Sequence, residues 1–177
     1  MYKKKYGRMT VSAWLSSEME QSSVAWMLII GIVCLLCGWG VRFSVGSPYT
    51  FLHTLSALDG TPPVWLMAFL WSVALFSIGC AGGFVLGYRE RGRGAEKYRG
   101  CLLFFFLVLC ELLWYAVFFG AHLVFISTLL SVCILCTSVA VTVAFCRVSK
   151  FASAILLMHD LWLVYMLILN FSILFQA

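Results

Sequence analysis

Glu111 is a charged side chain inside a long apolar stretch, being the one Asp, Glu, Lys or Arg between Gly100 and Cys146. A carboxylate within such a stretch is costly unless it faces a polar partner or a water-filled space. Trp114 and Phe118 follow three and seven residues later, which places both rings on the helical face that carries Glu111. This pattern is typical of a ligand-cavity wall or a proton site. The alternative interpretation is that the carboxyl group of Glu111 bonds to a neighbouring helix, since the same spacing would then be seen.

A second polar stripe lies near the C-terminus. His159, Trp162, Met166 and Asn170 recur at spacings of three and four residues, so they share one helical face. Asp160 projects about 100° around that helix from His159. The stripe predicts either a polar wall facing a cavity or a set of interhelical hydrogen bonds.

The tryptophans are the third group of residues that could form a functional site, and the chain contains seven of them. Trp71, Trp114 and Trp162 lie deep within apolar stretches, where they can form a flat aromatic ligand site or simply pack in a core. We find no metal-ligand cluster, phosphate-binding glycine loop or Ser-His-Asp order, so no metal or catalytic residue is assigned. The eight cysteines fall in or beside apolar stretches and are interpreted as small apolar side chains.

The composition identifies the solvent around the helices that carry these residues. Hydrophobic residues make up 63% of the chain and charged residues 11%, and the mean hydropathy is +1.02. Soluble domains carry about a quarter charged residues, so most of this surface must face lipid. The net charge of +5 arises from short basic clusters between apolar stretches, which argues against a nucleic-acid partner.

The apolar stretches predict an all-α integral membrane protein with five transmembrane helices. A helix rises 1.5 Å per residue and the lipid core is about 30 Å thick, so the region from 100 to 146 must be two spans, broken at Gly120–His122. A polar basic segment, residues 1–21, precedes the membrane domain, residues 22–177. It forms either a short interfacial helix or a disordered tail. The expected spans are about 22–42, 64–88, 101–119, 123–146 and 151–175.

The basic residues also predict an orientation. Of the 12 Lys and Arg residues, all except Arg42 fall before the first span, between spans two and three, or between spans four and five. The positive-inside rule then places the N-terminus in the cytoplasm and the C-terminus outside.

Gly79, Gly83 and Gly87 recur at spacings of four on the second expected span. Small residues at this spacing let another helix backbone approach closely. The series predicts either packing within one chain or the seam of a homodimer.

Five short motifs, in this order and on this five-span plan, resemble the translocator protein family, also called tryptophan-rich sensory proteins or peripheral benzodiazepine receptors. The resemblance runs from about residue 51 to the C-terminus. The motifs are Thr61–Trp65, Leu70-Trp71, Trp114–Phe119, Phe145–Ala154 and Trp162–Asn170.

Three departures mark this chain as a divergent member. Phe51-Leu52 stands where the family has Trp-Tyr, Cys110-Glu111 where it has Leu-Asn, and Met158-His159 where it has Pro-Tyr. Several of these positions line the ligand cavity in the family. The resemblance therefore implies a cavity whose ligand preference differs from that of other members.

By this resemblance the protein is a five-helix bundle, often a homodimer, that acts as a membrane receptor, sensor or carrier for hydrophobic planar ligands. Porphyrins or haem-like tetrapyrroles come first, bound without a covalent link, and sterols are a further class. Arg42 and the first loop could meet porphyrin propionates. The membrane is the bacterial cytoplasmic membrane, or the mitochondrial outer membrane in a eukaryote. The expected ligand-binding residues are Trp71, Glu111, Trp114, Phe118, His159, Trp162 and Asn170.

Three alternatives stay open. The chain could be a small proton-coupled transporter that uses Glu111, His159 and Asp160. It could be a light-dependent porphyrin-degrading enzyme, for which the family implicates the tryptophans matching Trp71 and Trp162. It could also be an assembly partner without a ligand.

Overall fold

The computed structural model describes residues 11–21, 24–45, 63–89 and 94–176. These residues are almost entirely helical and contain no strand, and five of the helices are long and apolar enough to cross a membrane. The predicted all-α, five-span fold is confirmed. The spanning helices are α2 (Val24–Val45), α4 (Val64–Gly87), α5 (Gly94–Tyr115), α6 (Val124–Cys146) and α7 (Lys150–Gln176).

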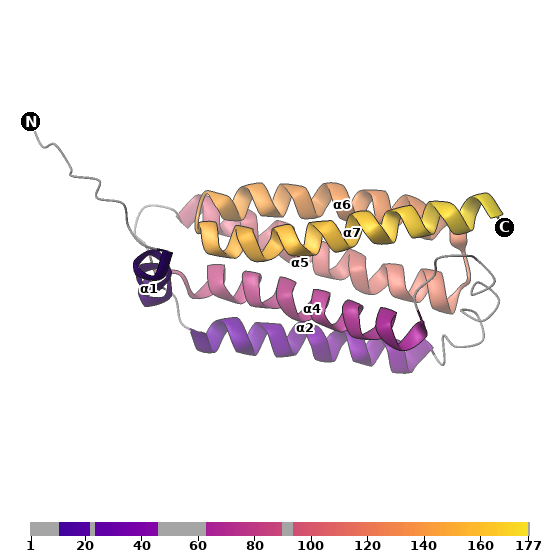
Figure 1. Ribbon diagram of the computed structural model, residues 1–177, viewed down its shortest axis with the longest axis horizontal. Coiled ribbons are helices and arrows are strands. Elements are labelled where there is room, and N and C mark those ends of the chain that lie inside the picture. The colour runs from indigo at the N-terminus through magenta and orange to yellow at the C-terminus, as the bar shows by residue number, and fades with distance from the viewer. Residues whose placement is uncertain (1–10, 22–23, 46–62, 90–93, 177) are drawn as a thin grey trace, which may run out of the picture.

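The five spanning helices run side by side (Figure 1), and their contacts close into a ring. Around the ring α2 packs on α4, α4 on α7, α7 on α6, α6 on α5, and α5 returns to α2. The largest contacts are α2 with α4 and α6 with α7. Because the ring is closed, side chains from several helices can converge on the interior.

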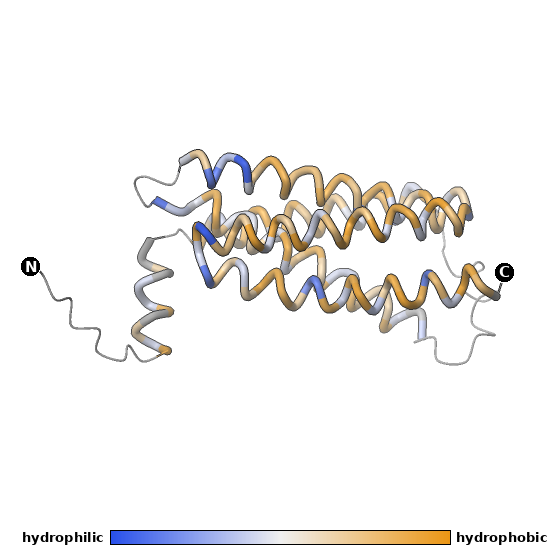
Figure 2. The backbone as a smooth tube through the Cα atoms, turned by 90° about the horizontal axis from the view of Figure 1, so that it is seen from above, coloured by the Kyte–Doolittle hydropathy of each residue, from blue (hydrophilic) through white to orange (hydrophobic). Residues whose placement is uncertain are grey.

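The outer surface of the ring is apolar. Large hydrophobic side chains are exposed on every spanning helix, among them Ile32, Phe69, Leu109, Phe125 and Ile168. Figure 2 shows hydrophobic residues along the length of the bundle and hydrophilic ones gathered at the end where α1 lies. Lipid is the solvent that suits such a surface, because the helices satisfy their own backbone groups.

Contacts made by neighbouring residues explain where α4 and α7 begin. Pro63 precedes α4, and its carbonyl accepts from the amides of Leu66 and Met67, a position where the missing proline N–H costs nothing. Ser149 caps α7, because its hydroxyl accepts from the amide of Phe151 at 3.2 Å.

The third span begins earlier than expected, at Gly94 instead of about residue 101. Lys97 explains part of this extension, because its ammonium donates to the carbonyls of Leu86 at 2.6 Å and Tyr88 at 3.0 Å. A cation at the C-terminal end of a helix satisfies carbonyls that the helix leaves free. The polar first turns of α5 are therefore held by the end of α4.

A short helix, α1 (Val11–Gln21), lies across one end of the bundle (Figures 1 and 2). The partly buried Met19 packs against the core. Of the two interpretations of the N-terminal segment, the structure shows the helix for residues 11–21. Lys3, Lys4, Lys5 and Arg8 lie outside the described residues, as do Phe51-Leu52 and Thr61-Pro62.

Gly79 and Gly83 hold α4 against α2 of the same chain. A Cβ on Gly79 would lie 2.7 Å from the Cα of Gly31, and one on Gly83 would lie 2.3 Å from the carbonyl oxygen of Trp26. Both distances are too short for a real side chain, so the close approach requires glycine. These two glycines are thus used within the monomer. Gly87 is half-buried at the end of α4.

Candidate functional site

Glu111 and His159 meet inside the bundle. Nε2 of His159 lies 2.6 Å from Oε1 of Glu111, and both side chains are almost completely buried. The two atoms are at ion-pair distance but are not aligned for a hydrogen bond. The contact joins α5 to α7 across the interior of the ring.

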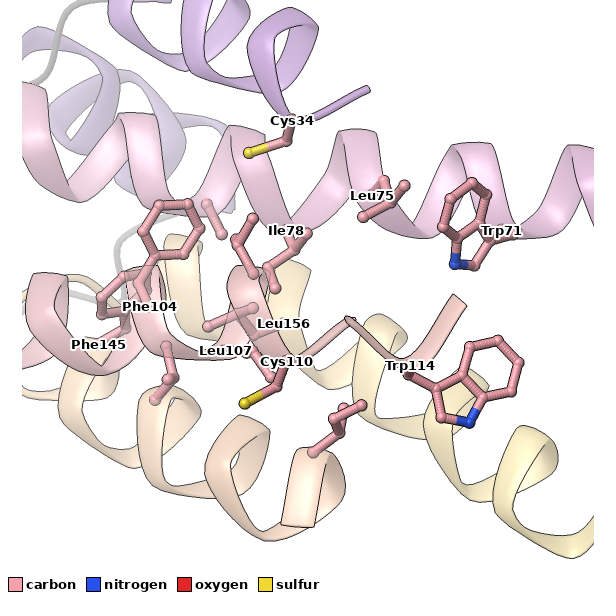
Figure 3. Packing of buried hydrophobic residues seen from close by; sticks show 14 of the residues in the cluster. Cys34, Trp71, Leu75, Ile78, Phe104, Leu107, Cys110, Trp114, Phe145 and Leu156 are labelled. Atoms are coloured by element: carbon pink, nitrogen blue, oxygen red, sulfur yellow. The ribbon is translucent and has the colours of Figure 1, made fainter. Parts of the chain in front are cut away.

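This pair lines a cavity together with three tryptophans, Trp71 from α4, Trp114 from α5 and Trp162 from α7. Five of the seven predicted ligand-binding side chains therefore surround one space. Figure 3 shows Trp71 and Trp114 on facing helices at one end of the packed core, beyond Leu75. The indole N–H of Trp114 is buried and has no hydrogen-bond partner among the described residues.

The cavity is small. It leaves about 30 Å³ for the centres of water molecules, which is room for about two waters. Most of the lining side chains are buried, whereas Trp162 and Leu163 of α7 are half-buried. The cavity therefore comes nearest to the surface beside α7.

An aromatic cluster surrounds the cavity on the α5 side. Trp71 stacks on Tyr115 at 4.5 Å between ring centroids, and Tyr115 lies 4.6 Å from Phe119. Phe119 contacts the edge of Phe118 at 4.8 Å, and Phe118 stacks on Trp114 at 5.1 Å. Contacts of this kind fix ring orientations beyond what burial alone achieves. The walls formed by Trp71 and Trp114 are held by their neighbours.

A π-helical turn, Ala116–Gly120, carries part of this cluster. The amide of Ala121 donates to the carbonyl of Ala116 at 3.0 Å, and His122 follows with φ of 56°. Turns of this type occur often at functional sites. Here the turn ends the α5 segment and holds Phe118 and Phe119 in the buried cluster.

Phe118 and Asn170 do not line the cavity. Phe118 is behind Trp114 and supports it by stacking. Asn170 is buried on α7, where its amide group donates to the carbonyl of Met166 at 2.7 Å, and its Oδ1 has no partner among the described residues. The structure thus separates these two residues from the five that meet in the cavity.

Asp160 is also away from the cavity. Its carboxylate accepts hydrogen bonds from Ser138 and, at 2.8 Å, from Thr142, both on α6. The side chain ties α7 to α6 and is not one of the lining groups. His159 and Asp160 are adjacent in sequence but contact different helices: His159 contacts Glu111 of α5, and Asp160 bonds to α6.

α6 also contributes to the cavity, although the seven predicted ligand-binding residues all lie on the second, third and fifth expected spans. Ser131 and Ile134 of α6 line the cavity, as do Leu163 and Met166 of α7. Only Met166 was part of the predicted stripe. A signal was present on α6, since hydroxyl residues recur on its buried face. They are Ser127, Thr128, Ser131, Ser138 and Thr142.

Arg42 lies at the end of α2, with its guanidinium 5.0 Å from the ring centroid of Trp39. It is half-exposed and does not line the cavity. The cavity walls therefore carry no Lys or Arg among the described residues.

The fold and the site define the class of helix-bundle membrane proteins with an aromatic cavity between the helices, a usual place for a ligand site. A sequence model of the TspO/MBR family matches residues 28–176. The chain therefore belongs to the TspO/MBR family. It is 31% identical over 158 residues to the tryptophan-rich protein TspO of Chlorobaculum tepidum, a match that covers 88% of this chain and 98% of the relative. Membership supports a membrane sensor or receptor of the TspO type.

Proposed function

We propose that the chain is a membrane sensor or receptor whose cavity binds a hydrophobic planar ligand, first of all a porphyrin or related tetrapyrrole. The observation that carries this proposal is the meeting of Trp71, Trp114 and Trp162 on one cavity. Flat aromatic walls with a few polar groups are what a planar hydrophobic ligand requires. Membership of the TspO/MBR family supports the same function.

A tetrapyrrole is larger than the cavity in its present form, which has room for about two water molecules. Binding therefore requires a second arrangement in which the walls separate, and the ligand favours that arrangement by its own contacts. The half-buried Trp162 and Leu163 make the α7 side the expected place of opening.

The test removes two cavity tryptophans in a Trp71→Phe, Trp162→Phe double variant. Protoporphyrin is titrated into detergent-solubilised protein, and the midpoint of the quenching of the remaining tryptophan fluorescence is measured. We expect the midpoint to rise about tenfold, since each lost indole contact contributes about 0.5–1.5 kcal/mol. The midpoint is used because the variant also loses two fluorophores.

The control is a Trp26→Phe, Trp65→Phe double variant, which removes the same number of indoles from exposed positions. Its midpoint should equal that of the unaltered protein. Equal midpoints for the two double variants would show that porphyrin binds elsewhere. Repeating the titration with haem and a sterol identifies the preferred ligand class.

Two other functions have less support from the geometry. A proton-coupled transporter is favoured by the buried contact between Glu111 and His159, but Asp160 is bonded to α6 instead of joining them. Light-dependent porphyrin degradation rests on the resemblance and on Trp71 and Trp162 alone. For the location, the bacterial relative points to a bacterial membrane, and we propose that the protein lies in the cytoplasmic membrane. We also propose that two copies of the chain form a homodimer.

A further inference from the structure

We propose that the cavity selects planar ligands that carry a compact positively charged group, which is seated against Glu111 between the tryptophans. This inference rests on the proposed function in one respect, namely that the ligand lies in this cavity. It adds the charge of the ligand, which neither family membership nor the relative supplies.

The charges around the cavity favour a cation. Glu111 is its one carboxylate and His159 its one basic group among the described lining residues. Glu111 is only 5% exposed. An ionised carboxylate buried to this degree must have a positive partner.

His159 occupies the place beside Glu111 that a cationic group of the ligand would take. Its Nε2 lies 2.6 Å from Oε1 of Glu111. His159 carries no second bond that would fix this arrangement, because its Nδ1 has no partner among the described residues. An ammonium group of the ligand can therefore displace the imidazole and donate to the carboxylate in its place.

The aromatic walls stabilise the same charge. The faces of indole rings attract cations, and tryptophan does so more strongly than tyrosine or phenylalanine. Trp71, Trp114 and Trp162 contribute to the wall from three different helices, so the carboxylate lies in an aromatic enclosure. Stacking on Tyr115 and Phe118 holds Trp71 and Trp114 in position.

The size of the cavity limits the charged group. Room for about two water molecules suits a primary ammonium on one methylene carbon, which has two non-hydrogen atoms. The planar part of the ligand then lies toward α7, where the cavity is nearest to the surface. An anionic group has no positive partner in the cavity except His159, which Glu111 already contacts. The propionates of a porphyrin would therefore have to lie outside the cavity.

Three probes that share one planar ring test this selectivity. They are 2-naphthylmethylammonium, the neutral and nearly isosteric 2-ethylnaphthalene, and the anionic 2-naphthylacetate. Binding to the detergent-solubilised full chain is measured by calorimetry, with empty micelles as the reference. We expect the cation to bind at least about tenfold more tightly than the neutral probe, and the anion to show no binding.

Glu111→Gln keeps the shape of the side chain and removes its charge, so the advantage of the cation should disappear while the neutral probe still binds. Glu96→Gln is the matched control, because Glu96 is an exposed carboxylate on the same helix. Its cation advantage should match that of the unaltered protein.

A neutral or anionic probe that binds the unaltered protein as tightly as the cation would overturn the proposal, even if Glu111→Gln failed to fold. A cation advantage that persists in Glu111→Gln would overturn it as well. If protoporphyrin binds and the cation advantage is absent, only the charge selectivity fails. If protoporphyrin and all three probes fail to bind, the proposed ligand cavity fails with it.

Discussion

Asp160 is a carboxylate inside a membrane span whose partners are hydroxyl groups instead of a cation. Ser138 and Thr142 both donate to it from α6. Other hydroxyls of α6 bond to their own helix, as Ser131 does to the carbonyl of Ser127, which is common for Ser and Thr in spanning helices. The bonds to Asp160 are therefore specific links between α6 and α7.

Removing these links should destabilise the bundle. In a Ser138→Ala, Thr142→Val double variant, Asp160 would keep its place and lose both partners. Leaving a fully buried acceptor unsatisfied costs about 1–3 kcal/mol, and more for a charged group. Asp160 is half-buried, so part of this cost applies. We expect a lower midpoint for unfolding of the detergent-solubilised protein, followed by circular dichroism as temperature rises.

Thr137→Val is the control, since its hydroxyl bonds only within α6, to the carbonyl of Cys133. That variant should unfold near the midpoint of the unaltered protein. A double variant as stable as the control would show that Asp160 does not depend on these hydroxyls.

At the scale of residues, the sequence predicted that Glu111 and His159 are unusual, but it did not predict that their side chains contact each other. Glu111 and His159 stand out because each is titratable within an apolar stretch, and helical spacing places each on a face. Their contact also depends on the rotation of α5 relative to α7, which is set by the packing of all five helices. For the same reason, the sequence did not show that His159 faces the cavity while Asp160 faces α6.

At the scale of elements, the pairing of α2 with α4 depends on backbone contact. Gly79 and Gly83 bring α4 against Gly31 and Trp26 of α2. α2 is otherwise the least buried of the five spanning helices. Its attachment to the bundle therefore relies on this close seam with α4, which is the largest contact between two of the helices.

Gly83→Ala should loosen that seam, because the added Cβ would meet the carbonyl oxygen of Trp26 at 2.3 Å. Overpacking of this kind costs about 1–3 kcal/mol. We expect faster protease cleavage between α2 and α4 in detergent, together with a lower unfolding midpoint.

Gly40→Ala provides the comparison, because a Cβ at Gly40 of α2 meets nothing within 4 Å. Alanine there should leave stability unchanged or raise it slightly, since it favours the helix. If both variants behaved alike, close contact at Gly83 would not be what holds α2.

The spanning helices were predictable because about 20 apolar residues are a strong signal. The beginning of α5 was not, because Lys97 bonds to carbonyls of α4 and extends the helix beyond its apolar part. The share of α6 in the cavity was also missed, since Ser131 is inconspicuous in sequence and acquires its role from its neighbours in the fold.

For the whole molecule, charge is distributed unequally between the two ends. Apart from Arg42, the described cations lie at or beside helix ends that share the end of the bundle where α1 lies (Figures 1 and 2): Arg89, Lys97, Arg99, Arg147 and Lys150. Arg42 lies at the opposite end. The positive-inside rule therefore still predicts that the α1 end faces the cytoplasm.

Reporter fusions in a bacterial host measure this orientation. Alkaline phosphatase fused to the C-terminus should be active, and green fluorescent protein fused there should not fluoresce. The same fluorescent protein fused to the N-terminus should fluoresce. The opposite pattern for both ends would reverse the orientation.

The π-helical turn at Ala116–Gly120 has a consequence for how this chain can change by deletion. A π turn contains one residue more than an α turn, and each residue rotates a helix by about 100°. Deleting one residue from this turn would restore an α turn and present a different ring to Trp114, while most of α5, including Glu111, kept its register. Because the chain turns at His122 immediately afterwards, the shift would be absorbed before α6 begins. A single-codon deletion could thus reshape the aromatic wall without altering the ion pair.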